Sequence, residues 1–199
     1  MTEAQDVLRQ DPVLRPLIES IDLSPHSPIH TPFTALSRSI ISQQLSVRAA
    51  DAILGRCVAH FSKEFEPEEL LKTPIATLRT LGLSGRKASY WHNIATHKQN
   101  NQQFWQDIQQ FSDQDIIEQL IQCKGVGLWT IQMLLMFNLQ RMDIFPIGDL
   151  AVRDAMTRLY KIDLPKKELY PKLESIAEKW SPHRTLASRY LWTWRSLQR

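Results

Sequence analysis

The sequence predicts an all-α protein, and two observations support this prediction. Apolar residues recur with helical spacing along most of the chain, and no stretch shows the strict apolar–polar alternation that is typical of a half-buried strand. Hydrophobic residues make up 43% of the 199 positions, which is enough to form a substantial core in one compact domain or two small lobes.

Composition excludes several classes of protein. No apolar run reaches the roughly 18 residues of a membrane span, and the polar, amphipathic start of the chain does not resemble a secretory signal. Two cysteines, Cys57 and Cys123, are too few for a disulfide framework or an iron–sulfur cluster, and the six dispersed histidines lack zinc-ligand spacing. We therefore expect no required cofactor and a reducing, intracellular compartment, which is the cytoplasm or nucleoid of a bacterium or the nucleus of a eukaryote.

Charge is unevenly distributed along the chain. Residues 151–199 contain eleven Lys or Arg and five Asp or Glu, a balance of +6, whereas residues 1–150 contain thirteen basic and sixteen acidic residues, a balance of −3. A basic C-terminal segment favours a polyanionic partner. An ordinary solvated face is the alternative.

The first half of the chain predicts two helices that meet at a short polar junction. Apolar positions from Phe33 to Ile41 form one helical face, and a second helix begins after the N-cap residue Ser46. Residues 42–46, with the sequence SQQLS, therefore connect two helices.

Further helix starts are predicted by turns and caps. A glycine-containing turn follows the helix that ends near residues 78–83, and a new helix begins at about Gly85. Ser112 and Asp115 have the spacing of a capping box. The last helices carry apolar faces made by Val152, Ala155, Met156 and Leu159, and then by Leu186, Tyr190 and Trp194.

The segment CKGVG predicts a tight turn between two helices. One helix ends near Gln122 and an apolar, uncharged helix begins near Leu128. Gly125 and Gly127 permit backbone conformations that a β-carbon would oppose, and they leave backbone N–H groups accessible at a helix N-terminus, where an anion such as a phosphate can bind. A plain connection between helices is the alternative.

Asp149 stands in a turn immediately before a predicted helix. It follows Pro146 and Gly148, so it is a good candidate for the N-cap of that helix. A functional carboxylate is the second interpretation, and the two are compatible because a helix N-terminus favours an ionised aspartate.

Four segments of this chain resemble segments of a known enzyme family. They are PFTALSRSIISQQLSVRAADAI, GVGLWTIQMLL, DIFPIGDLAVRDAM and WSPHRTLASRYLWTW. In this order they resemble the helix-hairpin-helix DNA glycosylase superfamily, whose signature is a Gly-Val-Gly hairpin, a buried helix and a later aspartate. The sequence looks most like the alkylpurine branch, the DNA-3-methyladenine glycosylase II type, and the resemblance extends from about Thr31 to Trp194.

The resemblance implies a base-excision enzyme. Such an enzyme binds damaged duplex DNA, flips the lesion nucleotide into a pocket and hydrolyses its N-glycosidic bond, because a stacked base cannot be attacked at its sugar carbon. Positive charge grows on the sugar as the bond stretches, and a fixed carboxylate stabilises that charge. The resemblance assigns this carboxylate to Asp149, ahead of its neighbours Asp143 and Asp154.

The resemblance also implies an electron-rich base pocket. A purine alkylated at a ring nitrogen is cationic, so aromatic rings bind it through stacking and cation–π contacts. The matching positions are Trp129 and Trp192, with Met133 as a further lining residue. Packing in the hydrophobic core is the alternative for each of them.

Two loops are expected to contact DNA by the same resemblance. The hairpin would hold a phosphate through Lys124, Gly125, Val126 and Gly127. The junction would supply the wedge that fills the gap left by the flipped base, from Gln43, Gln44 or Leu45. An ordinary polar turn with Leu45 packed inward is the alternative. By analogy with the family, a Na⁺ or K⁺ ion would bind to the backbone carbonyls of Ile121, Cys123 and Val126.

Position 129 bears on the expected product. Bifunctional members of the superfamily carry a lysine two residues after the second hairpin glycine, where it forms a Schiff base and nicks the strand. Here this residue is Trp129, so the resemblance implies a monofunctional enzyme that leaves an abasic site.

The implied architecture is one glycosylase domain, residues 1–199, made of two helical lobes with a central DNA-binding cleft. One lobe would comprise residues 31–143 and the other residues 1–30 with 144–199. The expected partner of this monomer is damaged double-stranded DNA, without membrane contact. Alternatives are a non-catalytic helix-hairpin-helix DNA-binding module, a glycosylase for a deaminated or oxidised base, and a helical protein–protein scaffold.

Overall fold

The structure is a computed structural model that describes residues 2–24, 27–62 and 64–198. Within these ranges every regular element is helical and no strand occurs, which confirms the all-α prediction. The chain divides into two compact units. The middle unit comprises residues 27–139, and the terminal unit comprises residues 1–26 with 140–199.

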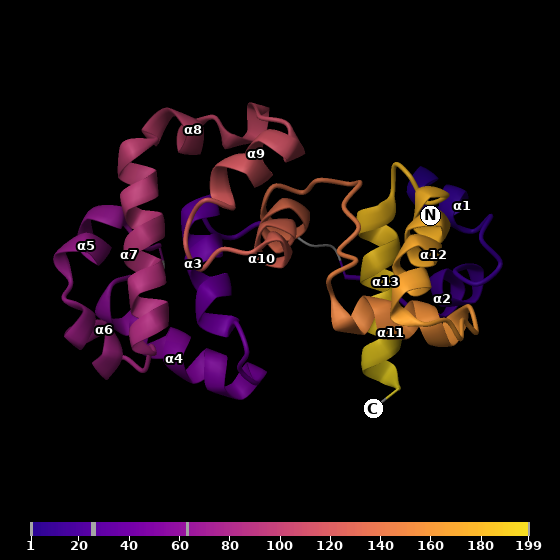
Figure 1. The fold of residues 1–199 in the computed structure, drawn as a ribbon, viewed down its shortest axis with the longest axis horizontal. Helices are drawn as coiled ribbons and strands as arrows, with labels where there is room; N and C mark the ends of the chain where they lie inside the picture. The colour runs from indigo at the N-terminus through magenta and orange to yellow at the C-terminus, as the bar shows by residue number, and fades with distance from the viewer. Residues whose placement is uncertain (1, 25–26, 63, 199) are drawn as a thin grey trace. The chain divides into compact units, whose positions relative to one another are not determined.

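The middle unit carries the hairpin and the junction (Figure 1). Its α-helices are α3 (Pro32–Ser42), α4 (Val47–His60), α5 (Pro67–Lys72), α6 (Ile75–Thr80), α7 (Gly85–Asn100), α8 (Gln102–Gln106), α9 (Asp113–Leu120) and α10 (Leu128–Met133). A 3-10 turn, Ile108–Gln110, precedes α9, and a π-helical turn, Leu134–Asn138, continues α10.

The terminal unit contains both ends of the chain (Figure 1). Its helices are α1 (Glu3–Leu8), α2 (Arg15–Ser20), α11 (Leu150–Leu159), α12 (Lys166–Glu178) and α13 (Arg184–Leu197). Asp149 caps α11 and Trp192 belongs to α13, so this unit carries the candidate carboxylate.

The predicted helix starts are confirmed where the sequence offered a capping residue. Ser46 is the N-cap of α4, α7 begins at Gly85, and Ser112 forms a capping box with Asp115 at the start of α9. Helix α12 was not predicted from the sequence. It contains Pro171, a residue that usually interrupts a helix because it lacks a backbone N–H.

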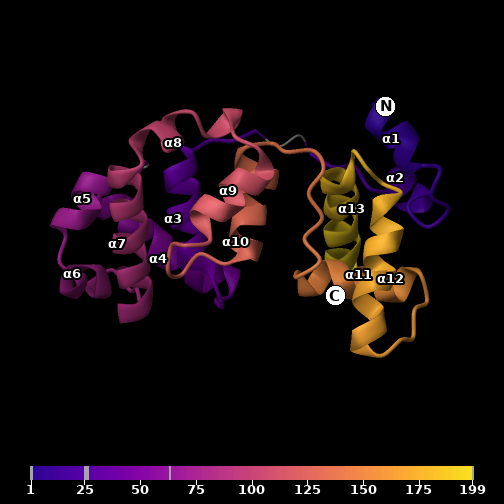
Figure 2. The ribbon, with the colours of Figure 1, turned by 45° about the horizontal axis from the view of Figure 1, so that its top comes forward.

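Helix α7 packs against α3 in the core of the middle unit (Figure 2). Trp91 of α7 is fully buried, and its indole N–H donates a 2.9 Å hydrogen bond to the carbonyl oxygen of Ser37 in α3. The ring of Phe65 lies 5.1 Å from the Trp91 ring, centroid to centroid. Truncating a buried aromatic residue typically costs about 3–5 kcal/mol of stability. The buried Trp91 side chain, with its hydrogen bond to Ser37, therefore fixes α7 firmly relative to α3.

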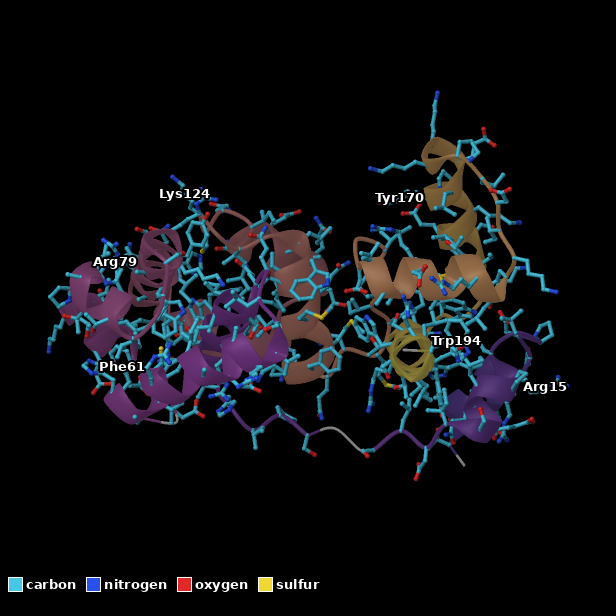
Figure 3. The ribbon with its side chains drawn as sticks, turned by 90° about the horizontal axis from the view of Figure 1, so that it is seen from below. Arg15, Phe61, Arg79, Lys124, Tyr170 and Trp194 are labelled. Atoms are coloured by element: carbon cyan, nitrogen blue, oxygen red, sulfur yellow. The ribbon has the colours of Figure 1, made fainter. Side chains whose placement is uncertain are left out.

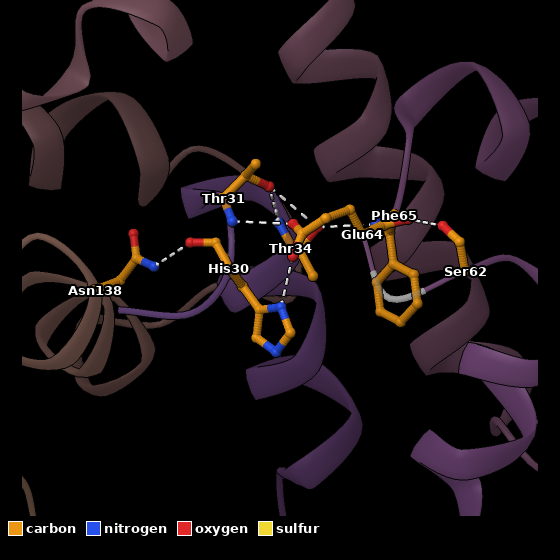
Figure 4. A network of polar contacts seen from close by, with 7 residues as sticks. All are labelled: His30, Thr31, Thr34, Ser62, Glu64, Phe65 and Asn138. Carbon is orange, nitrogen blue, oxygen red and sulfur yellow. Dashed lines mark hydrogen bonds and ion pairs between the residues drawn. The ribbon is translucent and has the colours of Figure 1, made fainter. Parts of the chain in front are cut away.

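A polar network anchors the segment that leads into α3 (Figure 4). His30 Nδ1 lies 2.6 Å from Glu64 Oε1, and the backbone N–H of Thr31 donates a 3.0 Å hydrogen bond to Glu64 Oε2. The side-chain amide of Asn138, at the end of the π-helical turn, donates to the carbonyl oxygen of His30 at 2.8 Å. The start of α3 is therefore tied to the far end of the α10 segment.

A half-buried carboxylate joins three parts of the terminal unit. Asp11, between α1 and α2, accepts hydrogen bonds from the Tyr160 hydroxyl at 2.6 Å and from the Trp180 indole N–H at 3.0 Å. Burial raises the pKa of Asp11, but these two donors and the backbone N–H groups of Val13 and Leu14 outweigh it, so the pKa lies below its ordinary value. The contacts hold the ends of α11 and α12 against the N-terminal helices.

Candidate functional site

The hairpin has the predicted helix–turn–helix form. Helix α9 ends at Leu120 and α10 begins at Leu128, and the turn is closed by backbone hydrogen bonds from Cys123 N to Leu120 O and from Val126 N to Cys123 O. Val126 is buried, whereas Lys124 is exposed and extends away from the hairpin (Figure 3). The turn therefore presents the basic side chain of Lys124 to solvent, while Val126 anchors it in the core.

The two hairpin glycines have different roles. Gly125 has a φ of +102°, and a β-carbon there would lie 2.1 Å from the ring of Tyr90, so both backbone conformation and space require glycine. Gly127 has an extended backbone with a φ of −101°, and nothing lies within 4 Å of the position of its β-carbon. The expectation that both glycines relieve backbone strain is thus wrong for Gly127, which instead leaves open space at the start of α10.

The apolar helix after the hairpin is buried only from its third residue. Thr130 and Ile131 are buried, but Leu128 and Trp129 in the first turn are 47% and 39% exposed. The expectation of a wholly buried helix is therefore wrong at the N-terminus of α10. Met133, one turn after Trp129, is half-buried.

The three wedge candidates at the junction have different surroundings. Leu45 is 40% exposed, so the alternative in which it packs inward is wrong. Gln44 is exposed and has a φ of +56°, and it lies with Leu45 between α3 and α4; we call this exposed pair the tip of the junction. Gln43 is half-buried, and its side-chain amide donates 3.1 Å hydrogen bonds to the carbonyl oxygen of Gly125 and to the hydroxyl of Thr130.

Asp149 is the N-cap of α11, as the sequence suggested. Its Oδ1 atom accepts hydrogen bonds from the backbone N–H groups of Ala151 at 2.9 Å and Val152 at 3.0 Å. The same oxygen accepts a 2.8 Å hydrogen bond from the indole N–H of Trp192. These three hydrogen bonds hold the carboxylate in place. Because Asp149 is only half-buried, part of its surface still reaches solvent.

The preceding turn is fixed by an arginine that the sequence analysis did not identify. Arg153, on the first turn of α11, donates from its guanidinium to the carbonyl oxygens of Ile147 at 2.9 Å and Gly148 at 2.8 Å. Because Arg153 follows Asp149 by one helical turn, its spacing was the only available sequence signal.

The rival carboxylates are both engaged in ion pairs. Arg184 donates to Asp143 at 2.7 Å and 2.9 Å, and Asp154 pairs with Arg158 and Arg195. Burial raises the pKa of Asp143, but the hydrogen bonds from Arg184 and Ser181 outweigh it and hold the pKa below its ordinary value. Both carboxylates are therefore held in ion pairs with arginines.

Trp192 does more than the sequence suggested. It is half-buried against the core of the terminal unit, and its N–H group orients the Asp149 carboxylate as described above. A role in base stacking stays a prediction for Trp192 and for Trp129, which belong to different units.

The candidate cation ligands are backbone carbonyls in the hairpin turn. Among the described residues no cluster of His, Cys, Asp or Glu could hold a metal ion. Two carbonyls of the hairpin, those of Lys124 and Gly125, accept hydrogen bonds from the side chains of Asn93 and Gln43. The proposed ligands are three other carbonyls, those of Ile121, Cys123 and Val126. Neutral carbonyl oxygens suit a monovalent cation.

The hairpin between α9 and α10 and the carboxylate of Asp149 are thus both present as the resemblance to DNA repair proteins implied. The sequence profile of the HhH-GPD superfamily of base excision DNA repair proteins matches residues 37–182. The chain belongs to this superfamily.

Named relatives and solved structures match most of the chain. The alkylbase DNA glycosidase-like protein mag2 of Schizosaccharomyces pombe is 32% identical over 174 residues, covering 85% of this chain and 80% of that protein. The structure of S. pombe 3-methyladenine DNA glycosylase Mag1 in complex with abasic DNA superposes with a TM-score of 0.82 at 29% identity, covering 96% of this chain and 95% of the other. The DNA-3-methyladenine glycosidase of Bacillus halodurans gives a TM-score of 0.84 at 31% identity and covers 98% and 89% of the two chains.

The helices in the described part of the chain are not of the membrane-spanning kind. None of its helices combines the length and the apolar character that a bilayer crossing requires.

Proposed function

We propose that this protein is a monofunctional DNA glycosylase that releases alkylated purines, of the 3-methyladenine type, from duplex DNA in the first step of base excision repair. The main support is its similarity, at 29% to 32% identity over most of the chain, to proteins whose names specify alkylbase or 3-methyladenine glycosylases. In this proposal it acts as a monomer on intracellular DNA.

The hairpin and the junction would bind and open the duplex. Backbone N–H groups at the N-terminus of α10, next to the open space at Gly127, suit a phosphate oxygen, and Lys124 adds a positive charge. Gln44 and Leu45, at the exposed tip of the junction, would enter the gap left by the flipped nucleotide. Extrusion of a damaged base costs less free energy than extrusion of an undamaged, paired base, and this difference contributes to selectivity.

Asp149 would stabilise the charge that develops on the sugar. A carboxylate fixed by three hydrogen-bond donors needs little reorganisation when positive charge appears beside it. An alkylated purine is a good leaving group because it is already cationic, so no strong general acid is required. Trp129 and Trp192 are each proposed to stack against the base, with Met133 as a further lining residue.

A hairpin cation would assist phosphate binding. The carbonyls of Ile121, Cys123 and Val126 would hold Na⁺ or K⁺, whose charge would attract the DNA backbone. We propose no chemical step that depends on it.

The product should be an unbroken strand with an abasic site. Position 129 holds tryptophan instead of lysine, so no amine is available there to form a Schiff base. Borohydride treatment during turnover should therefore give no covalent protein–DNA adduct, and denaturing gels should show nicks only after alkali. An adduct that disappears in Lys124→Ala would show that the hairpin lysine performs a lyase reaction.

Gly127→Val should weaken DNA binding without unfolding the protein. The extended backbone accepts a β-branched residue, but the side chain would fill the space that a phosphate needs. We expect roughly tenfold weaker binding to damaged and undamaged duplexes alike, since a hydrogen bond to a charged group contributes about 1.5–3 kcal/mol. The slope of log affinity against log salt should fall by about one unit.

Two glycine variants control this experiment. Gly55→Val introduces the same side chain at another open position, within α4, and should leave DNA binding unchanged. Gly125→Ala should lower the melting temperature, because its β-carbon meets Tyr90 and its φ is positive. A folded Gly127→Val protein that binds undamaged DNA normally but changes its lesion preference would assign the hairpin to the base pocket.

Release of free bases from alkylated DNA, identified by chromatography, tests the proposed function directly. Release of 3-methyladenine or another alkylpurine by the wild-type protein, lost in Asp149→Asn, supports it. Salt-dependent DNA binding without release of any base would favour a non-catalytic module. Release of only deaminated or oxidised bases would favour a glycosylase for another lesion.

A further inference from the structure

Four side chains connect the junction to the hairpin inside the middle unit. They are Gln43, Lys87, Tyr90 and Asn93, and we refer to them as the brace. The junction and the hairpin are far apart in sequence, but α7 contacts both of them (Figure 2).

Gln43 provides a direct link between the two loops. Its backbone belongs to the junction, whereas its side-chain amide donates to the carbonyl oxygen of Gly125 in the hairpin turn and to the hydroxyl of Thr130 in α10, both at 3.1 Å. Thr130 is buried, so this side chain points into the protein and is not available as a wedge.

Helix α7 supplies the other three contacts at intervals of three residues. The ammonium group of Lys87 donates to the carbonyl oxygens of Ile41 at 2.6 Å and Gln43 at 2.7 Å, at the C-terminal end of α3. The ring of Tyr90 occupies the space beside Gly125, and the amide of Asn93 donates to the carbonyl oxygen of Lys124 at 3.2 Å. One face of α7 thus holds the junction at one end and the hairpin at the other.

The contact between the Lys87 ammonium group and the end of α3 is also electrostatically favourable. Carbonyl groups at the end of a helix lack intrahelical partners, and a cation there interacts favourably with the helix dipole. Burial lowers the pKa of Lys87. Lys87 is therefore used to close the end of α3, which removes it from the set of lysines that contact a phosphate.

We propose that the brace makes the junction and the hairpin one rigid DNA-binding element, so that anchoring of a phosphate at the hairpin drives insertion of the junction tip into the duplex. Insertion of the junction must overcome base stacking, which costs free energy. If the junction could move back relative to the hairpin, the free energy of phosphate binding at the hairpin would not be available for insertion. Function of this kind needs groups held within about 0.5 Å of their working position. The four residues act as positioning residues and do not contact the reacting atoms.

The proposal rests on the proposed function in one respect, that the junction enters DNA. Its test uses Gln43→Met and Asn93→Leu, which keep side-chain size but remove the amide donors. Matched controls are Gln99→Met and Asn100→Leu, which make the same changes at exposed positions near the end of α7. The substrate is a duplex with a tetrahydrofuran abasic analogue opposite 2-aminopurine, whose fluorescence reports loss of stacking at the gap.

The expected result separates insertion from anchoring. Each brace variant should keep its melting temperature and its affinity for undamaged duplex close to wild type, because the hairpin still binds phosphate. The equilibrium constant for insertion, read from 2-aminopurine fluorescence at saturating protein, should fall about tenfold for the loss of one hydrogen bond to the hairpin. The two controls should match wild type in all three measurements.

Other results would overturn the brace. Wild-type fluorescence in both variants would show that the contacts are ordinary packing. A loss of affinity for undamaged DNA as large as the loss of insertion would show general damage to the binding surface. If Gln43→Met unfolds, Asn93→Leu decides alone, because its hydrogen bond lies at the surface.

The readout also distinguishes failure of the brace from failure of the proposed function. Fluorescence at the abasic analogue requires no excision. A wild-type protein that inserts its junction but releases no alkylpurine would refute the proposed glycosylase and leave the brace supported. Efficient excision by wild type together with unchanged insertion in both variants would refute the brace alone. The absence of any fluorescence change with wild type would refute insertion of the junction, and with it both the brace and that part of the proposed function.

Discussion

Asp149→Asn is expected to fold normally and to lose base excision by about a thousandfold, the magnitude found when a preorganised charge-stabilising group is removed. The amide oxygen of asparagine can accept the hydrogen bonds that Ala151, Val152 and Trp192 now donate to Oδ1. Asparagine also caps a helix about as well as aspartate, so the start of α11 should be preserved. Only the negative charge beside the sugar is lost.

The measurements for this variant are the melting temperature and the single-turnover rate of base release. Asp154→Asn is the matched control, since it removes a carboxylate from α11 that is already paired with Arg158 and Arg195. This control should excise bases at the wild-type rate and lose at most a small amount of stability. Excision near wild type in Asp149→Asn would reduce the aspartate to a helix cap.

Trp192 variants should show whether this residue orients the carboxylate, stacks on the base, or does both. Trp192→Phe keeps an aromatic ring but removes the N–H group that donates to Asp149, and we expect about tenfold slower excision, since hydrogen bonds to charged groups contribute about 1.5–3 kcal/mol. Trp192→Ala also removes the ring, and stacking contributes about 1–3 kcal/mol per base, so a loss of roughly a hundredfold or more is expected.

The comparison between the two variants distinguishes the roles. Equal losses in both would assign Trp192 to orientation of Asp149 alone, and a near-normal Phe variant with a poor Ala variant would assign it to stacking alone. Trp194→Phe, two residues further along α13, controls for loss of core packing and should excise normally. The combination with Asp149→Asn should be strongly non-additive, because two residues in contact act as one unit.

Local features of the sequence determined the helical class and several element boundaries. Ser46, Ser112 and Asp149 were recognisable as caps because a capping side chain bonds to a backbone N–H only two or three residues away. The hairpin limits were likewise set by the two glycines and the apolar run that follows them. Family motifs connected these local features with DNA repair.

Contacts between distant segments decided what each candidate residue does. The sequence could not distinguish Gly125 from Gly127, because the difference lies in a positive φ and in the ring of Tyr90, which comes from another helix. It also left Gln43 among the wedge residues, although its amide is bonded to groups 82 and 87 positions away.

The contact between Trp192 and Asp149 shows the same limit most clearly. The two residues are 43 positions apart, and only the packing of α11 against α13 brings the indole N–H to the carboxylate. Periodicity and capping report the chain within a few turns of itself, so the sequence determined which residues begin and line each helix. The tertiary structure alone decided which side chains meet, because that depends on how separate helices bury their apolar faces against one another.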